Sequence, residues 1–254
     1  MKALFVIGLA ILLCCNLYAQ GNKGKVDTTN QKNLFRQAAL TSNPPPPDTV
    51  EKIQVITDYD DTHLNILPNG LNDYIKKESE RLYNDLGNVN VIALDLYDGK
   101  VATTREDAGK FMQAVKEDRA QAIIKGAIEY AGPKARIATI GWCFGGGWSL
   151  QASIMAGKQD VACVMYYGMP EKSVDRLKTL NADVLGNFAN KDQWINPKVV
   201  AQFETDMKEA GKKLYVHEFD ADHAFANPSN PHYNKDATAD AYSKAIPFIK
   251  ERMK

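Results

Sequence analysis

Short apolar runs alternate with longer amphipathic stretches through most of the chain. Buried strands are predicted, from length and apolar content, at residues 89–96, 135–140, 161–167, 183–189 and 213–219. Helices are predicted, between and after these runs, at residues 72–86, 104–130, 148–156, 197–210 and 237–253. This alternation implies crossover connections, and it therefore predicts an α/β fold with a mostly parallel, doubly wound sheet and helices on both faces.

A Gly-Trp-Cys-Phe-Gly pentapeptide at residues 141–145 stands between a predicted strand and a predicted helix. This setting is typical of a nucleophile elbow, here carrying Cys143, in which glycines leave room for the neighbouring strand and helix. The N-terminal N–H groups of the following helix would point at the sulfur and favour its thiolate. A lone cysteine among glycines is more often a small residue that fills a gap, so the interpretation requires a base and an acid elsewhere.

Two such groups follow later strands of the predicted sheet. Asp192 comes after the apolar run 183–189, and His223 comes after the run 213–219. Because parallel strands end at the same edge of a sheet, both side chains are expected at the edge that carries Cys143. Their order along the chain, nucleophile, acid and base, is the order of the α/β-hydrolase plan.

The division of labour follows from acid–base chemistry. His223 would accept the thiol proton and later return it to a leaving group, while Asp192 would hold the imidazole in the required tautomer. Phe144 would offer its backbone N–H to the oxyanion that forms during acyl transfer. Asp220 and Asp222, which lie close to His223 in sequence, are alternative orienting acids.

Composition and charge narrow the classes of function. The 254 residues include 31 basic and 31 acidic side chains with no basic cluster, which argues against nucleic acid as a partner. Histidine and cysteine never stand at paired metal-ligand spacings, so we predict no metal. Cys163 lies in an apolar run and is interpreted as a small core residue, so we also predict no disulfide with Cys143.

The N-terminus has the pattern of an export signal over residues 1–19, with cleavage expected after Ala19. Its apolar stretch is shorter than the roughly 20 residues that a membrane-spanning helix requires. We therefore predict a periplasmic or extracellular protein with no membrane association after cleavage; a retained anchor or a lipid-modified cysteine is the alternative. Residues 20–48 are polar and end in successive prolines, which predicts a linker, and residues 49–254 are the predicted folded domain.

Several segments together carry a resemblance to a known family. They are Gly-Leu-Asn-Asp-Tyr-Ile at 70–75, Asp-Leu-Tyr-Asp-Gly-Lys at 95–100, the elbow with the following glycine, Phe-Ala-Asn-Lys-Asp at 188–192 and Asp-His-Ala-Phe at 222–225. In these segments the chain closely resembles the dienelactone hydrolase family. The resemblance implies a single-domain α/β-hydrolase that opens lactones or cleaves esters with a Cys-His-Asp triad and no cofactor. It also supports assigning the triad to Cys143, His223 and Asp192.

One departure from the family concerns the substrate pocket. Members that hydrolyse dienelactone hold its carboxylate with two arginines, at places where this chain has Gly99 and Asn227. Lys100 would supply one positive charge without the bidentate geometry of arginine. Dienelactone itself is therefore not the expected substrate. The expected pocket residues are Lys100, Trp142, Trp194 and Asn227, although the tryptophans fit the core equally well.

A second departure concerns the oxyanion hole. Aligned back from Gly70, the family's second oxyanion donor becomes Pro68, and a glutamate that contacts the nucleophile becomes Leu67. Proline has no N–H, and loss of one such donor costs about 2.7 to 4 kcal/mol of transition-state stabilisation. Leu71 or Asn69 would have to turn an amide inward instead, and Leu71 is the candidate that we select.

The stretch before this loop is also short. Residues 49–70 have room for about two strands and a turn, so the family's longer opening section cannot all fit. Either residues 64–67 form a shortened central strand, or part of the N-terminal strands is missing and another segment fills the gap.

Taken together, these features predict a cofactor-free hydrolase, a monomer or weak homodimer, that cleaves a small-molecule ester, lactone or thioester through a cysteinyl acyl-enzyme. The altered oxyanion loop and the missing arginines motivate one alternative. In that reading the chain is a catalytically impaired member of the family that binds a ligand or partner in the same pocket.

Overall fold

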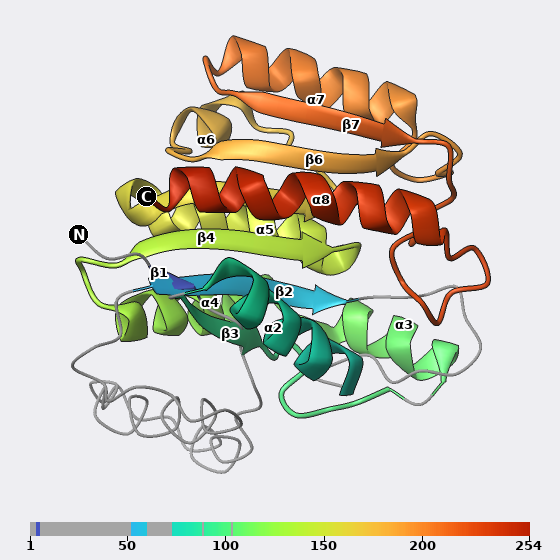
Figure 1. The fold of residues 1–254 in the computed structure, drawn as a ribbon, viewed down its shortest axis with the longest axis horizontal. Helices are drawn as coiled ribbons and strands as arrows, with labels where there is room; N and C mark the ends of the chain where they lie inside the picture. Colours follow the sequence, from blue (N-terminus) through green and yellow to red (C-terminus); the bar gives the residue numbers. More distant parts are fainter. Residues whose placement is uncertain (1–3, 6–51, 60–72, 88, 103) are drawn as a thin grey trace.

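The computed structural model describes residues 4–5, 52–59, 73–87, 89–102 and 104–254. These residues form a seven-stranded sheet with the order β3-β2-β4-β5-β6-β7 and the short β1 beside β4. All pairings between its strands are parallel, and helices cover the sheet on both faces (Figure 1). The predicted α/β fold with a parallel, doubly wound sheet is confirmed.

The elements alternate along the chain as the apolar pattern predicts. The strands are β1 (Leu4–Phe5), β2 (Lys52–Tyr59), β3 (Asn90–Leu94), β4 (Arg136–Trp142), β5 (Asp160–Tyr166), β6 (Asp183–Ala189) and β7 (Leu214–Phe219). The helices are α2 (Asp73–Leu86), α3 (Arg105–Ala114), α4 (Glu117–Ala131), α5 (Phe144–Ala156), the short 3₁₀ helix η2 (Gly157–Gln159), α6 (Val174–Lys178), α7 (Pro197–Glu209) and α8 (Lys235–Arg252).

Two helices differ from the sequence-based expectation. The stretch 104–130 is divided into α3 and α4, because Val115 takes an extended backbone with φ −63° and ψ 119°. Helix α5 begins at Phe144 rather than at Trp148, so the glycines after the elbow lie inside its first turn. The close approach of another segment to this turn, described below, gives the reason for glycine there.

The place between β3 and β4 is occupied by β2, a strand that the apolar pattern did not assign. Its partners run from Ile53 opposite Asn90 to Thr57 opposite Leu94 on β3. On the other side, Tyr59 stands opposite Trp142 of β4. The segment 64–67, one of the two expected solutions for this gap, lies outside the described residues. Among the described residues, the earlier segment Lys52–Tyr59 takes the place between β3 and β4.

The sheet is buried on both faces. In β5, Cys163 and Met165 pack into a cluster with Leu150 of α5 and Phe203 of α7. Alternate residues of the same strand, Ala162, Val164 and Tyr166, belong to a larger cluster that also includes side chains of α2 and α8. Successive side chains of a strand point to opposite faces, so a strand covered on both sides appears in the sequence as a continuous apolar run.

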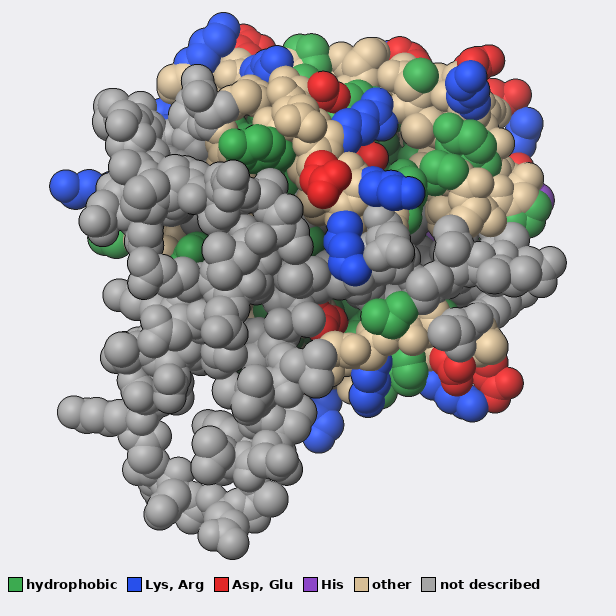
Figure 2. Space-filling model, turned by 60° about the horizontal axis from the view of Figure 1, so that its bottom comes forward, with side chains coloured by type: hydrophobic (Ala, Val, Ile, Leu, Met, Phe, Trp, Pro, Cys, Tyr) green, Lys and Arg blue, Asp and Glu red, His purple; other side chains and the backbone are tan. Residues whose placement is uncertain are grey.

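The N-terminal predictions fall almost entirely outside the described residues. Within 1–48 only Leu4 and Phe5 are described, and they pair with Ile137 and Ala138 of β4. The export signal, the linker and the cellular location stay predictions. None of the described helices is long and apolar enough to cross a membrane. On the face shown in Figure 2, the described basic and acidic side chains are interspersed.

Candidate active site

Three side chains meet at the edge of the sheet where the strands end. Cys143 follows β4, Asp192 comes just after β6, and His223 comes after β7. The Cys143 Sγ lies 3.0 Å from Nε2 of His223, and Nδ1 of His223 lies 2.5 Å from Oδ2 of Asp192. The structure thus brings together the three residues that the sequence placed at this edge, in a continuous row from thiol to carboxylate.

The backbone at Cys143 takes a conformation that L-residues rarely adopt, with φ 53° and ψ −120°. Such a conformation costs about 1–3 kcal/mol and persists only where surrounding contacts enforce it. Here the Cys143 N–H donates to the carbonyl of Tyr166 at 2.9 Å, and the Cys143 carbonyl accepts from Gly146 at 2.9 Å. These two hydrogen bonds connect the elbow to the end of β5 and to the first turn of α5.

Two glycines allow this close approach. A Cβ on Gly146 would lie 2.7 Å from the carbonyl oxygen of Tyr166 and 2.9 Å from Cα of Gly168. A Cβ on Gly168 would lie 2.4 Å from the backbone of Gly146. The sequence indicated the need for Gly146, but it gave no reason to select Gly168. Its only sequence signal is its place at the end of a predicted strand.

Both carboxylate oxygens of Asp192 have hydrogen-bond partners. Oδ1 accepts the backbone N–H groups of Trp194 at 2.8 Å and Ile195 at 3.0 Å, while Oδ2 faces His223. Burial tends to raise the pKa of Asp192, but the hydrogen bond and charge of His223, together with the two N–H groups, lower it below its ordinary value. Asp192 is therefore a carboxylate at neutral pH, although only 2% of it is exposed.

The alternative acids have other partners. Asp220 forms an ion pair with Lys191 at 3.0 Å, and Asp222 lies 3.5 Å from Nδ1 of His232. Of the three aspartates considered in the sequence, the one that faces His223 is Asp192.

The imidazole of His223 contacts two aromatic rings. The ring of Tyr167 meets it edge-on at a centroid distance of 5.1 Å, and the ring of Trp194 does so at 5.3 Å. The backbone of Tyr167 also has a positive φ of 37°, and its N–H donates to the carbonyl of Asn187 at 2.8 Å. Tyr167 is a site residue that the sequence analysis missed, because it looked like the last apolar residue of a strand.

A pocket of about 460 Å³ opens over the thiol and is lined by Cys143 and His223. Most of the remaining wall is apolar, and it includes Met112, Phe144, Trp148, Met169, Pro170 and Trp194. Among these, Met169 and Trp194 are large apolar side chains that are about half exposed, at 48% and 49%. The site can therefore admit a small organic molecule with an apolar part.

Of the four residues predicted to line the pocket, only Trp194 is found in its described wall. Trp142 is 4% exposed and stacks on Tyr166 at 5.3 Å, so it belongs to the core. Asn227 is also buried, and its Oδ1 accepts from the N–H and hydroxyl of Ser229, which stabilises a turn. Lys100 lines a separate pocket of about 190 Å³. The expectation for Trp142, Asn227 and Lys100 is corrected accordingly.

The oxyanion donors are described only in part. Phe144 is the first residue of α5, and the N–H groups of a first helical turn have no acceptor within the helix. Its amide therefore stands next to the thiol at the positive end of the helix dipole. Leu71, the predicted second donor, lies outside the described residues, as do Leu67 and Pro68. Within the described chain, no group of three or more His, Cys, Asp or Glu side chains could hold a metal ion.

Comparison with known proteins places these features in context. A model of the dienelactone hydrolase family matches residues 69–253. The chain is 29% identical over 119 residues to a carboxymethylenebutenolidase of Pseudomonas sp., an alignment that covers 46% of this chain and 48% of the relative. It is 29% identical over 173 residues to Protein usf of Aquifex pyrophilus, covering 63% of this chain and 73% of that protein. The chain thus spans about half of the length of the first of these relatives.

Solved structures share the fold. A dienelactone hydrolase-like promiscuous phosphotriesterase from metagenomic libraries superposes with a TM-score of 0.65 at 18% identity, covering 79% of this chain and 86% of that chain. A dienelactone hydrolase from Anabaena variabilis gives a TM-score of 0.52 at 17% identity, with the same coverage of 79% and 86%. These similarities show that the sheet and helices described above have the α/β-hydrolase fold.

Proposed function

Because the chain belongs to the dienelactone hydrolase family, we propose that it is a cofactor-free hydrolase that cleaves a small ester, lactone or thioester through a cysteinyl acyl-enzyme. The observation that carries this proposal is the row of contacts from the Cys143 sulfur through His223 to the buried carboxylate of Asp192. A nucleophile, a base within hydrogen-bond reach and a third group that orients the base are the parts that covalent acyl transfer requires.

In the first half of the reaction, Nε2 of His223 accepts the thiol proton while the Cys143 sulfur attacks the substrate's carbonyl carbon. The C=O electron pair moves to oxygen, and the Phe144 N–H stabilises the resulting oxyanion. When the intermediate collapses, the bond to the leaving oxygen or sulfur breaks and His223 returns the proton to the leaving group. The acyl group remains on the sulfur as a thioester.

Water completes the second half of the reaction. His223 takes a proton from the water as its oxygen attacks the thioester carbonyl, and the proton then passes to the departing Cys143 sulfur. The products are a carboxylic acid and the free thiol. Asp192 stays ionised throughout, because its role is to accept the Nδ1–H of His223 and to offset the charge of the imidazolium.

The decisive test compares two cysteines. The Cys143→Ala protein should lose at least about 10³-fold in kcat/KM for 4-nitrophenyl acetate, because removal of a nucleophile leaves only binding and oxyanion stabilisation. The matched control is Cys163→Ala, at a free cysteine that is buried. It should stay within about threefold of the unaltered protein, because a small core substitution leaves the reacting groups in place.

Alkylation separates the proposal from its alternative. If Cys143 is an activated thiolate, iodoacetamide should modify it quickly at neutral pH and leave Cys163 unmodified in the folded protein. Equal hydrolysis by the Cys143→Ala protein would refute the proposed mechanism. Slow alkylation combined with no hydrolysis of any activated ester would instead favour a family member that binds a ligand without turning it over.

A further inference from the structure

The pocket over Cys143 offers a substrate no charged partner from its described wall. Its described lining contains no Lys, Arg, Asp or Glu side chain, and Gln151 is the one amide side chain there. Met169 and Trp194 are half exposed at the pocket, so their apolar surface is available to a bound molecule. Burial of this surface against an apolar group is favourable by roughly 25 cal/mol per Å².

Three positive side chains, one of them in the Asp-Leu-Tyr-Asp-Gly-Lys motif, line a different cavity. Lys100, Lys116 and Arg119 line the smaller pocket, in which Arg119 pairs with Asp98. The ammonium of Lys100 lies 5.4 Å from the centre of the Phe111 ring in the same small pocket.

The two pockets are lined by aromatic rings that stack on each other. Tyr97 lines the smaller pocket and Phe144 lines the larger one, and their centroids are 6.4 Å apart at an interplanar angle of 19°. Lys100 therefore belongs to the lining of the smaller pocket and not to the described lining of the pocket over Cys143.

A negative charge lies close to the reacting groups. The carboxylate of Asp192 is directly behind His223, and the hydrogen bonds described above keep it ionised. A substrate that carried its own carboxylate would lose hydration on entering the pocket and would gain no cationic partner from the described wall. An uncharged ester has no charge to dehydrate and so avoids this free-energy cost.

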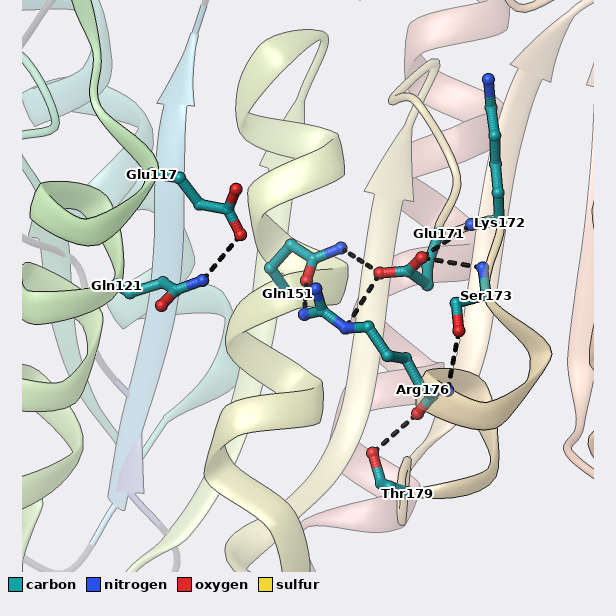
Figure 3. Close-up of polar contacts among 8 residues, drawn as sticks. All are labelled: Glu117, Gln121, Gln151, Glu171, Lys172, Ser173, Arg176 and Thr179. Carbon is teal, nitrogen blue, oxygen red and sulfur yellow. Dashed lines mark hydrogen bonds and ion pairs between the residues drawn. The ribbon is translucent and has the colours of Figure 1, made fainter.

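One wall of the pocket is fixed by a polar cluster, shown in Figure 3. Gln151 of α5 donates from Nε2 to Oε2 of Glu171 at 3.1 Å. Arg176 of α6 pairs with the same oxygen at 3.2 Å and donates from Nη2 to Oε1 of Gln151. The second oxygen of Glu171 accepts the N–H groups of Lys172 at 2.9 Å and Ser173 at 2.8 Å.

This cluster has two consequences for the site. Glu171 directly follows Met169 and Pro170, so the cluster ties this piece of the wall to α5 and α6. Burial tends to raise the pKa of Glu171, but the Ser173 N–H, Gln151 and Arg176 lower it, so Glu171 and Arg176 form a neutral ion pair. The cluster therefore supports the wall without presenting a net charge to the pocket.

We infer that this pocket selects uncharged esters with an apolar acyl group, and that the Gln151–Glu171–Arg176 cluster positions the Met169–Pro170 wall against that group. The inference rests on the proposed hydrolase function, because the acyl group remains bonded to the Cys143 sulfur in the acyl-enzyme. It must therefore occupy the pocket that the sulfur lines. Glu171 and Arg176 act here as positioning residues, since Gln151 is the member of the cluster that lines the pocket.

The charge preference is tested with two esters of nearly equal shape. 4-Nitrophenyl 5-methylhexanoate ends in an isopropyl group where the 4-nitrophenyl monoester of glutaric acid ends in a carboxylate. After subtraction of the rate in Cys143→Ala protein, kcat/KM for the neutral ester should be higher by at least about tenfold, which corresponds to about 1.4 kcal/mol of discrimination. Equal or faster turnover of the anionic ester would overturn the inference.

The cluster is tested by the ratio of kcat/KM for the 5-methylhexanoate ester to that for 4-nitrophenyl acetate. In Arg176→Met and Glu171→Gln proteins this ratio should fall about fivefold, while kcat/KM for acetate stays within about twofold, because a displaced wall loses contact only with the longer acyl group. Arg176→Lys, which keeps the charge, should recover part of the ratio. Lys178→Met on the same helix is the matched control, and its ratio should not change.

The possible failures are distinguishable. Hydrolysis that survives in Cys143→Ala protein would refute the proposed function. Hydrolysis that depends on Cys143 but shows no preference for the neutral ester would refute only the inferred substrate class. An unchanged ratio in Arg176→Met protein, even with a lower melting temperature, would show that the cluster stabilises the fold without positioning the wall.

Discussion

At the scale of single residues, the site depends on which atom of one side chain faces which atom of another. Asp192 shows this most directly, because its two oxygens have separate tasks. Oδ1 is fixed by the N–H groups of Trp194 and Ile195, and this leaves Oδ2 turned toward His223. A carboxylate in this position selects the tautomer of His223 that carries its proton on Nδ1 and leaves Nε2 free to accept the thiol proton.

Asp192→Asn should therefore inactivate the site without disturbing its shape. The asparagine Oδ1 can still accept from the two N–H groups, but its NH₂ would face His223 and favour the tautomer protonated at Nε2. We expect kcat/KM for 4-nitrophenyl acetate to fall by about 10²- to 10⁴-fold. The matched control is Asp222→Asn, which should stay within about twofold, since Asp222 lies against His232. An equal loss in the control would mean that Asp222 orients the base.

At the scale of elements, the site depends on the close packing of the elbow and the first turn of α5 against the backbone after β5. The last residue of β4, the elbow and the first turn of α5 lie against the backbone that follows β5. The contact between Gly146 and Gly168 determines how far α5 approaches β5, and hence where the thiol sits. Local propensity would not choose glycine inside a helix, so the reason for it lies in the neighbouring segment.

Two glycine substitutions should have opposite effects. Gly146→Ala would place its Cβ 2.7 Å from the Tyr166 carbonyl, so we expect the free energy of unfolding to fall by about 1–3 kcal/mol and hydrolysis to fall with it. Gly109→Ala, inside α3 with nothing within 4 Å of the new Cβ, should raise the free energy of unfolding by about 0.5–1 kcal/mol. Urea unfolding measures both. A Gly146→Ala protein as stable and active as its parent would contradict the described packing.

At the scale of the whole molecule, the two ends of the parallel sheet have different chemistry. The end that carries Cys143 gathers the reacting groups. At the opposite end, where β5 begins, the carboxyl of Asp160 is buried and accepts a hydrogen bond from Ser153. Burial raises the pKa of Asp160 to about 8, against hydrogen bonds from Ser153 and the backbone that lower it. The folded protein therefore keeps this group neutral at pH values where an unfolded chain would ionise it.

The raised pKa of Asp160 predicts how the free energy of unfolding varies with pH. Asp160 has a folded pKa above its unfolded value, so between pH 4 and 8 the native state holds one more proton than the unfolded state. Its contribution to stability is fully present below the unfolded pKa and is lost as pH rises toward 8, by up to about 1.4 kcal/mol per pH unit. Urea unfolding at pH 5, 6, 7 and 8 should show that the unaltered protein becomes less stable relative to Asp160→Asn as pH rises. If the free energies of unfolding of the two proteins changed in parallel with pH, the prediction would be contradicted.

The family assignment rests on segments from most of the chain. The segments that carry the resemblance are far apart along the chain, and the family match over residues 69–253 confirms the family that they implied together. The sheet confirms the parallel topology on which the site prediction depended. The pocket residues were predicted less well. Trp142 and Trp194 were selected by proximity in sequence to the elbow and to the acid loop, and Lys100 and Asn227 by places at or beside the family's arginines, and neither signal shows which way a side chain points.

The alternation of strands and helices, the elbow at Cys143 and the sheet edge from which Asp192 and His223 project could all be predicted from the residues alone. These follow from periodicity and from the order of strand ends along the chain, which are local properties. Contacts in the folded chain were needed to show which aspartate faces His223, that Trp142 packs in the core, and that β2 lies between β3 and β4. Such outcomes depend on contacts between distant segments, because a shift of one residue along a strand turns a side chain to the other face.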